Sequence, residues 1–383
     1  MSKITGKDYL NVELYYEQES WIRQLPEEYR KRSEMSAFDR AFLCGLIKKY
    51  RPRKMVEAGV AAGTTSAVIL NCLGSLELET VCYSIDICEN YYRDSSRKSG
   101  YVVDEVKDRI KNCDKINHKM LLGKSFPERL EEIGGEIDFL ILDTMHRLPG
   151  ELLDFIAAYP FLSEHAIVVL HDIGLNLLNQ NDFYMAPKVV FDTVSADKYL
   201  MADVDQLHGL PNIGAFRITK ATRDNIGDLF SCMTYSWHYL PDLKLMRAYR
   251  RIVEQYYEDR FLSYFDRAWI LQREMAENTV LKKKLLKKAW NEYEHILFYG
   301  AGKVGSIFYY FARENALKID GVVVSDLSKV NEFEKSIFDD VPMYEWRDRP
   351  YNPDECGILI TVGARYHDEI FDIVTREGYK VIG

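Results

Sequence analysis

The chain has 383 residues, of which 47% are hydrophobic and 13% aromatic, and its formal net charge is −9. A chain of this length favours two domains over one, and its apolar content is high enough for ordinary buried cores, which excludes a largely disordered protein. Because the negative charge is spread along the chain, a broad nucleic-acid-binding surface is not expected.

The N-terminal sequence MSKITGKDYL has no apolar core of signal-peptide length. No stretch approaches the roughly 20 apolar residues that a membrane span needs. The seven cysteines are scattered and never spaced C-x-x-C, so we expect reduced thiols, mostly buried, rather than disulfides or a zinc site. These features favour a cytoplasmic protein without an integral membrane segment.

The first part of the chain alternates short apolar runs with helical patterns. Residues 8–50 are predicted to be helical, with Ser36 as the N-cap of the helix that follows it. Strands are predicted at 54–60, 80–86, 119–123, 136–143 and 166–172, helices at 64–74, 102–112, 125–133 and 150–162, and a late strand that closes the sheet at 211–219. This alternation is typical of βαβ units around a mostly parallel sheet that is buried on both faces.

The pattern changes after residue 220. Residues 221–292 form a charged helical stretch that predicts one or two long amphipathic helices. A strand–turn–helix pattern restarts at 295–311, and 321–326 and 357–363 are predicted to be further strands. We therefore predict an α/β protein with a Rossmann-like domain at 1–220, a helical linker at 221–292 and a second, smaller Rossmann-like domain at 293–383.

A glycine-spaced turn, EAGVAAG at 57–63, follows the first predicted strand and precedes a helix. Glycines let the backbone approach a ligand closely, and a helix N-terminus offers unpaired N–H groups. Taken alone, such a turn can also be a tight strand-to-helix connection that holds no ligand.

The motifs after this turn make the pattern specific. Asp86 ends YSID, Gly123–Ser125 follow the third strand, and EIDFLILDTMHR and AIVVLHD come next. In this order they resemble class I S-adenosylmethionine-dependent methyltransferases over residues 35–220. In that family, an acid at the position of Asp86 accepts hydrogen bonds from both ribose hydroxyls, and Glu57 would orient the turn or approach the amino-acid end of the cofactor. The resemblance implies an S-adenosyl-L-methionine site at Glu57, Gly59, Ala61, Gly63, Asp86, Ile87, Ser125 and Asp143.

The D-x-x-H pattern after the fourth strand, with HD after the fifth, resembles a branch that methylates oxygens of small molecules, including macrolide-sugar and catechol methyltransferases. Acids at the positions of Asp143 and Asp172 hold a magnesium ion in that branch, and the ion lowers the pKa of the acceptor hydroxyl. His171 stands where those enzymes tend to have another residue, and histidine is a poor magnesium ligand. The predicted centre of Asp143, Asp172 and His171 therefore suits manganese or another metal, or no metal. Alternatively, His171 simply orients the neighbouring acid.

His146, three residues after Asp143, is the predicted general base, and Asp143 is its predicted catalytic partner. Imidazole titrates near neutral pH and can accept the proton of a hydroxyl group. The alternative for His146 is a loop histidine that hydrogen-bonds a carbonyl group.

Two segments, 88–101 and 173–187, leave the same edge of the predicted sheet. Their aromatic residues Tyr91, Tyr92, Phe183 and Tyr184 can pack against a sugar or an aromatic ring of an acceptor. The alternative is ordinary surface loop.

The long helical stretch carries an apolar stripe at helical spacing: Tyr249, Ile252, Tyr256, Phe261, Tyr264 and Phe265. We expect packing between the domains or in a homodimer, and no role in cofactor binding. The basic run LKKKLLKKAW at 281–290 is expected to be a solvated helix face, with contact to an anionic lipid or glycan as the alternative.

A second glycine turn places Gly300, Gly302 and Gly305 in G-x-G-x-x-G spacing, and Asp326 ends the next predicted strand. This context is typical of nucleotide binding, with the acid contacting a ribose. The domain is shorter than a full dinucleotide fold and resembles small Rossmann-like modules attached to sugar-modifying enzymes. There, such a module binds a nucleotide-linked part of the substrate or only packs.

Together, these motifs predict an S-adenosyl-L-methionine-dependent methyltransferase. Its expected substrate is a small molecule, the hydroxyl group of a sugar or nucleotide sugar in glycan, polysaccharide or natural-product biosynthesis. Two alternatives stay open. One is a nucleotide- or nucleotide-sugar-binding protein that uses the second glycine turn and transfers no methyl group. The other is a C- or N-methyltransferase with the same donor site.

Overall fold

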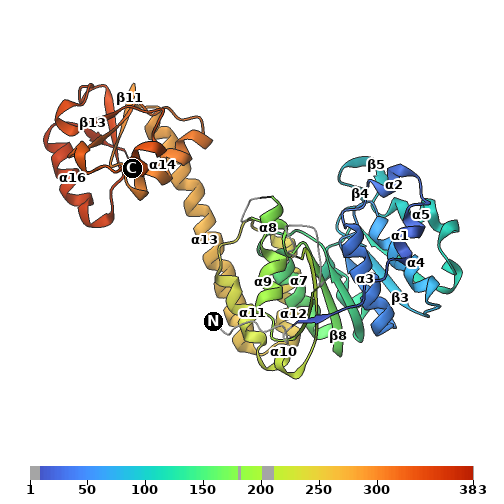
Figure 1. Ribbon diagram of the computed structural model, residues 1–383. Helices are drawn as coiled ribbons and strands as arrows, with labels where there is room; N and C mark the ends of the chain where they lie inside the picture. The colour runs from blue at the N-terminus through green and yellow to red at the C-terminus, as the bar shows by residue number, and fades with distance from the viewer. Residues whose placement is uncertain (1–8, 180–182, 201–210, 383) are drawn as a thin grey trace. The chain divides into compact units, whose positions relative to one another are not determined.

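The computed structural model of the chain describes residues 9–179, 183–200 and 211–382. It divides into two compact units, Met1–Arg273 and Glu274–Gly383, and this boundary falls inside the segment 221–292 that was predicted to be a linker. Each unit contains its own sheet and its own buried cores (Figure 1). The predicted α/β class, with a mostly parallel first sheet and a second, smaller one, is confirmed.

The first unit is built around an eight-stranded sheet in the order β1-β9-β10-β8-β7-β2-β3-β6. Its strands are β1 (Tyr9–Asn11), β2 (Lys54–Ala58), β3 (Val81–Asp86), β6 (Asn117–Leu122), β7 (Ile137–Leu142), β8 (Leu162–His171), β9 (Asp197–Leu200) and β10 (Ile213–Arg217). Strand β10 runs antiparallel to β8 and β9, while the pairs from β8 to β6 are parallel. The late strand β10 was predicted to close the sheet, which is wrong, because β9 and β1 lie beyond it.

Helices cover both faces of this sheet (Figure 1). One face packs against α3 (Ala37–Tyr50), α4 (Thr64–Ser75) and α5 (Tyr101–Val106), and the other against α7 (Gly150–Ala158), α9 (Ala186–Thr193), α11 (Ile226–Ser231) and α12 (Leu243–Tyr256). Side chains along a strand alternate between the two cores: Met55 lies in the first, and Val56 in the second. Both faces are apolar, as the continuous hydrophobic strands predicted.

The N-terminal region is less continuous than predicted. Residues 8–50 were expected to be helical, but the described part contains β1 and three separate helices, α1 (Glu17–Ile22), α2 (Glu27–Arg30) and α3. Ser36 is the N-cap of α3, as predicted: its side chain accepts from the backbone N–H of Asp39, and the Asp39 side chain accepts from the backbone N–H of Ser36. This capping box satisfies helix donors that otherwise lack partners and fixes where α3 begins.

The segment 88–101 forms a hairpin of β4 (Asn90–Tyr91) and β5 (Asp94–Lys98). Short helices α6 (Leu130–Ile133), α8 (Leu175–Leu178) and α10 (Lys220–Asp224) complete the first unit. The 3-10 turn η3 (Phe126–Glu128) follows β6 at the edge of the sheet where the parallel strands end.

The amphipathic stripe of the long helices packs onto the second core, the one that contains Val56. Tyr249, Ile252 and Phe265 are buried there, whereas Tyr256 and Tyr264 are partly exposed. Helix α13 (Asp259–Trp290) continues past the boundary between the two units. In the basic run, Lys287 and Lys288 are exposed, and the side chains of residues 281–286 lie outside the described ones.

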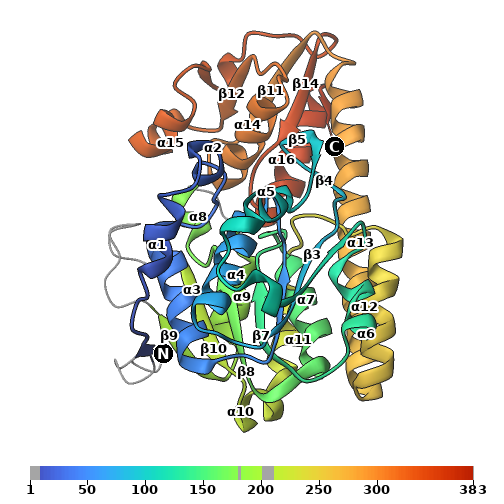
Figure 2. The same cartoon turned by 90° about the vertical axis from the view of Figure 1, so that its right-hand side faces the viewer.

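The second unit has a five-stranded parallel sheet in the order β13-β12-β11-β14-β15. It contains β11 (His295–Tyr299), β12 (Gly321–Val324), β13 (Met343–Glu345), β14 (Cys356–Ile360) and β15 (Lys380–Val381), with helices α14 (Lys303–Glu314), α15 (Glu332–Ile337) and α16 (Ala364–Arg376) (Figure 2). Its first strand is central, and the next two strands lie on one side of it. This is the strand order of a doubly wound nucleotide-binding half with additional strands.

All seven cysteines are free, and five of them are buried. Within the described residues, no helix combines the length and the apolar character that crossing a membrane requires.

Candidate active site

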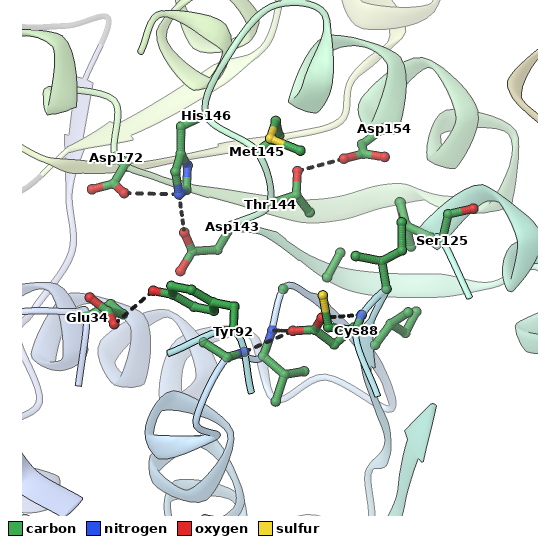
Figure 3. A pocket seen from close by; sticks show the side chains of 18 of the residues that line it. Glu34, Cys88, Tyr92, Ser125, Asp143, Thr144, Met145, His146, Asp154 and Asp172 are labelled. Carbon is green, nitrogen blue, oxygen red and sulfur yellow. Dashed lines mark hydrogen bonds and ion pairs between the residues drawn. The ribbon is translucent and has the colours of Figure 1, made fainter. Parts of the chain in front are cut away.

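A cavity of about 590 Å³ opens in the first unit, where β2, β3, β6, β7 and β8 end. This volume lies within the range of about 300–1,000 Å³ that is usual for small-molecule and cofactor sites. The glycine turn, the ends of the parallel strands and residues from the later helical segment line it (Figure 3). Ligands of open parallel sheets bind at this edge.

The glycine turn forms one wall of the cavity through Gly59, Val60 and Ala61. Gly59 has φ +93°, and a side-chain carbon there would lie 1.8 Å from the carbonyl oxygen of Asp143. Gly63 has φ +91°, and a side-chain carbon there would lie 2.7 Å from the Cα atom of Gly100; Gly63 itself does not line the cavity. The two glycines therefore serve close backbone packing, and Gly59 in addition borders the cavity.

Asp86 fastens this turn to the end of β3. One carboxylate oxygen accepts from the N–H groups of Val60 and Ala61 at 3.1 and 3.0 Å, and the other accepts from Cys88 at 2.8 Å. Since a carboxylate offers about four acceptor positions, about one stays open for a ligand. Asp86 and the exposed Ile87 both line the cavity, and contact between Asp86 and two ribose hydroxyls stays a prediction.

Two further residues of the predicted cofactor site, Ser125 and Glu57, are fixed by hydrogen bonds to neighbouring side chains. Ser125 lines the cavity, and its hydroxyl donates to Glu128 at 2.7 Å. Glu57 is buried outside the cavity wall and accepts from the hydroxyl of Ser66 at 2.6 Å, which ties β2 to α4. The structure thus favours the orienting role for Glu57 over contact with the cofactor.

Burial raises the pKa of Glu57 to about 7, although hydrogen bonds from Ser66 and Ser84 oppose the shift. A carboxyl group whose pKa is raised on folding stabilises the fold below its unfolded pKa of 4.5, and this contribution is lost as the pH rises through 7. We therefore expect Glu57→Gln to remove a pH-dependent loss of about 3 kcal/mol between pH 5 and pH 8. Urea unfolding at several pH values measures it.

Glu79→Gln, which changes an exposed glutamate, is the matched control. It should keep the pH dependence of the wild type. Parallel stability curves for Glu57→Gln and the wild type across this pH range would show that Glu57 does not titrate there.

Three side chains meet where β7 and β8 end side by side. Asp143 follows β7, Asp172 follows β8, and His146 lies in the loop after β7. The Nε2 atom of His146 lies 3.8 Å from Asp143 and 3.5 Å from Asp172 (Figure 3). One potential ligand atom from each of the three lies within 4.8 Å of the others. His146 and Asp172 have φ +61° and +62°, unusual values that recur at functional sites.

A buried glutamate holds the loop that carries His146. Glu151, on α7, accepts from the backbone N–H groups of His146 and Thr144 at 2.7 and 3.1 Å. Burial lowers the pKa of His146, but the hydrogen bond to Glu151 and the charges of Asp143 and Asp172 outweigh it and raise the pKa to about 9. The role of His146 as the general base stays a prediction.

His171, the predicted third metal ligand, lies behind the cluster instead of in it. Its side chain is 2% exposed, and its Nδ1 atom lies 3.2 Å from Asp143, while Nε2 lies 3.7 Å from Asp39 of α3. Burial lowers the pKa of His171, but Asp143 and Asp172 raise it well above its ordinary value. His171 is thus placed to orient Asp143, whereas the alternative considered for it was to orient the neighbouring Asp172. His146 lies beside the two acids instead.

The predicted aromatic lid is only partly present. Tyr91 is fully buried in the core, so its ring is not available to an acceptor, whereas Tyr92 is exposed and lines the cavity beside Glu34. Phe183 packs on His238, and Tyr184 accepts from Arg147; neither lines the cavity. Residues 180–182 of the second predicted segment lie outside the described residues.

In the second unit, the glycine turn at the start of α14 faces acids. Gly300 has φ +120°, and Gly305 lies against the carbonyl oxygen of Gly300. At Gly302 the nearest side-chain atom is a carboxylate oxygen of Glu334, and the carboxylate of Asp326 accepts from the backbone and hydroxyl of Ser328. A bound pyrophosphate would meet the charge of Glu334, and nucleotide binding in this unit stays a prediction.

Comparison with known proteins identifies the first unit's central segment. Residues 56–173 match a family model described as a methyltransferase domain. A relative named uncharacterized protein y4gI, from Sinorhizobium fredii, is 27% identical over 130 residues, which are 33% of this chain and 14% of that protein. The chain therefore spans only a small part of this relative.

Several solved structures are also similar to the first unit. The O-methyltransferase TomG from Streptomyces achromogenes, solved with SAM, is 14% identical with a TM-score of 0.38, and covers 53% of this chain and 99% of its own. An O-methyltransferase from Bacillus cereus, solved with SAH, is 13% identical with a TM-score of 0.38, and covers 52% and 90%.

The strand order, the cavity at the ends of the parallel strands and the matched segment agree with the motifs in the sequence. Residues 56–173 of this chain therefore form a methyltransferase domain, and its motifs resemble those of class I S-adenosylmethionine-dependent enzymes.

Proposed function

We propose that the chain transfers the methyl group of S-adenosyl-L-methionine to a hydroxyl oxygen of a small molecule, with a sugar or nucleotide sugar as the substrate class. The observation that carries this proposal is the cluster of Asp143, His146 and Asp172, which lines the same cavity as the glycine turn. Donor and acceptor would then meet at the end of β7, where an in-line displacement needs them close and aligned.

The residues of the cavity fit a sulfonium nucleoside. The wall at Gly59–Ala61 exposes backbone without bulky side chains, Asp86 keeps about one acceptor position open, and Ser125 lines the same cavity. Several acids face this space, which suits the positive charge of the donor. Gly59, Ala61, Asp86, Ile87, Ser125 and Asp143 are the residues proposed to hold it.

The cluster also fits a divalent cation. Two carboxylates and one imidazole suit manganese or a similar metal better than magnesium, which prefers oxygen ligands. A bound cation would supply Lewis-acid activation of the acceptor hydroxyl. The chain's own contribution is to orient the two acids through His171 and Asn212, and to hold the His146 loop through Glu151.

Calorimetry with S-adenosylhomocysteine tests the donor site. We expect the wild type to bind, and Asp86→Ala to bind at least tenfold more weakly, because the glycine turn loses two backbone hydrogen bonds to this carboxylate and Cys88 loses a third. Asp104→Ala, on an exposed face of α5, should bind like the wild type. Absence of binding by the wild type would contradict the proposed function, and equal heats for Asp86→Ala would remove Asp86 from the site.

Three parts of the proposal depend on separate observations. The exposed ring of Tyr92 beside the cavity supports a sugar acceptor, since aromatic faces pack well on sugar rings. Seven free cysteines support a reducing, cytoplasmic setting. Exposed Ile270 and Leu271 on α13 support a homodimer.

Mass spectrometry of nucleotide sugars incubated with protein and donor would detect the expected gain of one methyl group.

A further inference from the structure

The wall of the cavity opposite the metal cluster contains a buried acid that the proposed reaction leaves unused. Asp154, on α7, is 4% exposed and lines the cavity. The hydroxyl groups of Thr144 and Tyr249 each donate to one of its oxygens at 2.7 Å. A carboxylate has about four acceptor positions, so these two bonds leave about two unfilled on a group that faces the cavity.

None of the neighbours that shift the pKa of Asp154 carries a positive charge. Burial raises the pKa of Asp154 to about 7, and the neighbouring charge, Glu151, is also an acid. A buried charge is costly unless it is both hydrogen-bonded and paired with an opposite charge, and Asp154 has only the hydrogen bonds among the neighbours named here. In a ligand cavity, such a group fits a ligand that brings hydrogen-bond donors.

The position of Asp154 indicates which part of a ligand it meets. Helix α12 contacts both α7 and the turn η3 after β6, and Lys244 of α12 pairs with Glu128 of that turn at 2.9 Å. Tyr239, Leu245 and Tyr249 thus enter the cavity beside Ser125. Figure 3 shows Asp154 and Ser125 on one side of the pocket and the pair of His146 and Asp172 on the other. The base of the nucleoside belongs on the side of Ser125, because the methyl group must reach the opposite side.

We propose that Asp154 accepts a hydrogen bond from the amino group of the cofactor's purine base, and that Tyr239 and Tyr249 complete this subsite. The inference rests on the proposed function for the presence of the cofactor. It extends the cofactor site beyond the matched domain of residues 56–173 to α12, for which the sequence predicted only packing. Tyr249 acts as a positioning residue, since its hydroxyl contacts Asp154.

Two nucleosides that differ at one position test this subsite. S-adenosylhomocysteine carries an amino group on the purine, and S-inosylhomocysteine carries a carbonyl oxygen there, which would face the carboxylate of Asp154. Calorimetry should show that the wild type prefers S-adenosylhomocysteine by at least tenfold, because a site built for a donor rejects the analogue that lacks it. In Asp154→Asn the side-chain amide can donate to the carbonyl, so the preference should fall to about threefold or less.

The ratio of the two dissociation constants is the readout, since a general loss of affinity leaves it unchanged. The control Asp104→Asn should keep the wild-type ratio. Tyr249→Phe removes one hydrogen bond to Asp154 and should give an intermediate ratio. This second variant tests the proposal if Asp154→Asn does not fold. The proposal is overturned if the wild type binds both nucleosides equally well. It is also overturned if Asp154→Asn keeps the preference of the wild type or, where that variant is unfolded, if Tyr249→Phe keeps it. Such results would leave methyl transfer untouched, whereas failure of both nucleosides to bind the wild type would contradict the proposed function itself.

Discussion

Asp143→Ala should weaken the binding of Mn²⁺ by about 100-fold or more, because it removes one of the three side chains whose ligand atoms lie within 4.8 Å of one another. The remaining pair, His146 and Asp172, still offers two ligands, but the site has lost one ligand and one negative charge. Titration of the protein with Mn²⁺, followed by the electron paramagnetic resonance signal of the free ion, measures this affinity.

The matched variants separate the loss of a ligand from the loss of any acid. Asp192→Ala removes an exposed acid on α9 that pairs with Lys188, and it should bind Mn²⁺ like the wild type. Asp172→Asn keeps the volume of its side chain but loses the charge, and it should bind at least tenfold more weakly. If wild type and Asp143→Ala bind Mn²⁺ with the same affinity, the cluster is not a metal centre.

The sequence was a good guide to which residues stand at the strand ends. Parallel strands present their carboxyl ends at one edge, and the chain order of the motifs therefore predicted that Asp143 and Asp172 lie close together. The structure brings them together on the adjacent strands β7 and β8. The buried faces of these strands followed from their continuous apolar runs.

Strand patterns in the sequence did not predict that His146, and not His171, lies beside the two acids. His171 is the last residue of β8, so its side chain points into the core on one face of the sheet, while that of Asp172, just beyond the strand, reaches the cavity. The backbone at Asp172 and His146 adopts positive φ. Aspartate and histidine adopt this conformation more often than most residues, but their presence alone does not predict it. Register and face near a strand end thus decide which histidine lies beside the two acids, and spacing alone did not predict it.

Residues that support the site from a distance in the sequence were not predictable. Asp39 belongs to the capping box of α3, and this local pattern explains its presence without indicating that it lies beside His171. Glu151 and Asp154 occupy the first turns of α7 and have no motif of their own. Tyr249 was predicted to pack between the domains or in a homodimer, whereas it is buried in a core of the first unit, and its contact with the cavity depends on how α12 packs against α7.

Gly59→Ala should lower stability and abolish both proposed binding functions, since this glycine lies between the cavity wall proposed to hold the cofactor and Asp143 of the proposed metal site. A side-chain carbon at residue 59 would lie 1.8 Å from the carbonyl oxygen of Asp143, and φ is +93°. The added carbon would clash with a backbone atom, which cannot rotate away as a side chain can, so only separation of the ends of β2 and β7 relieves the clash. We expect a loss of about 3 kcal/mol or more, a decrease of the melting temperature by roughly 6–12 °C, and loss of S-adenosylhomocysteine binding.

Gly135→Ala provides the control, because a side-chain carbon there meets nothing within 4 Å and its φ is not in the left-handed region. Its stability should stay within about 0.5 kcal/mol of the wild type. Thermal unfolding by circular dichroism and calorimetry with S-adenosylhomocysteine compare the two variants. Wild-type melting and binding in Gly59→Ala would mean that β2 and β7 do not approach as closely as described. Because Asp143 follows β7 directly, that result would also remove the geometric basis for placing donor and acceptor at the same strand end.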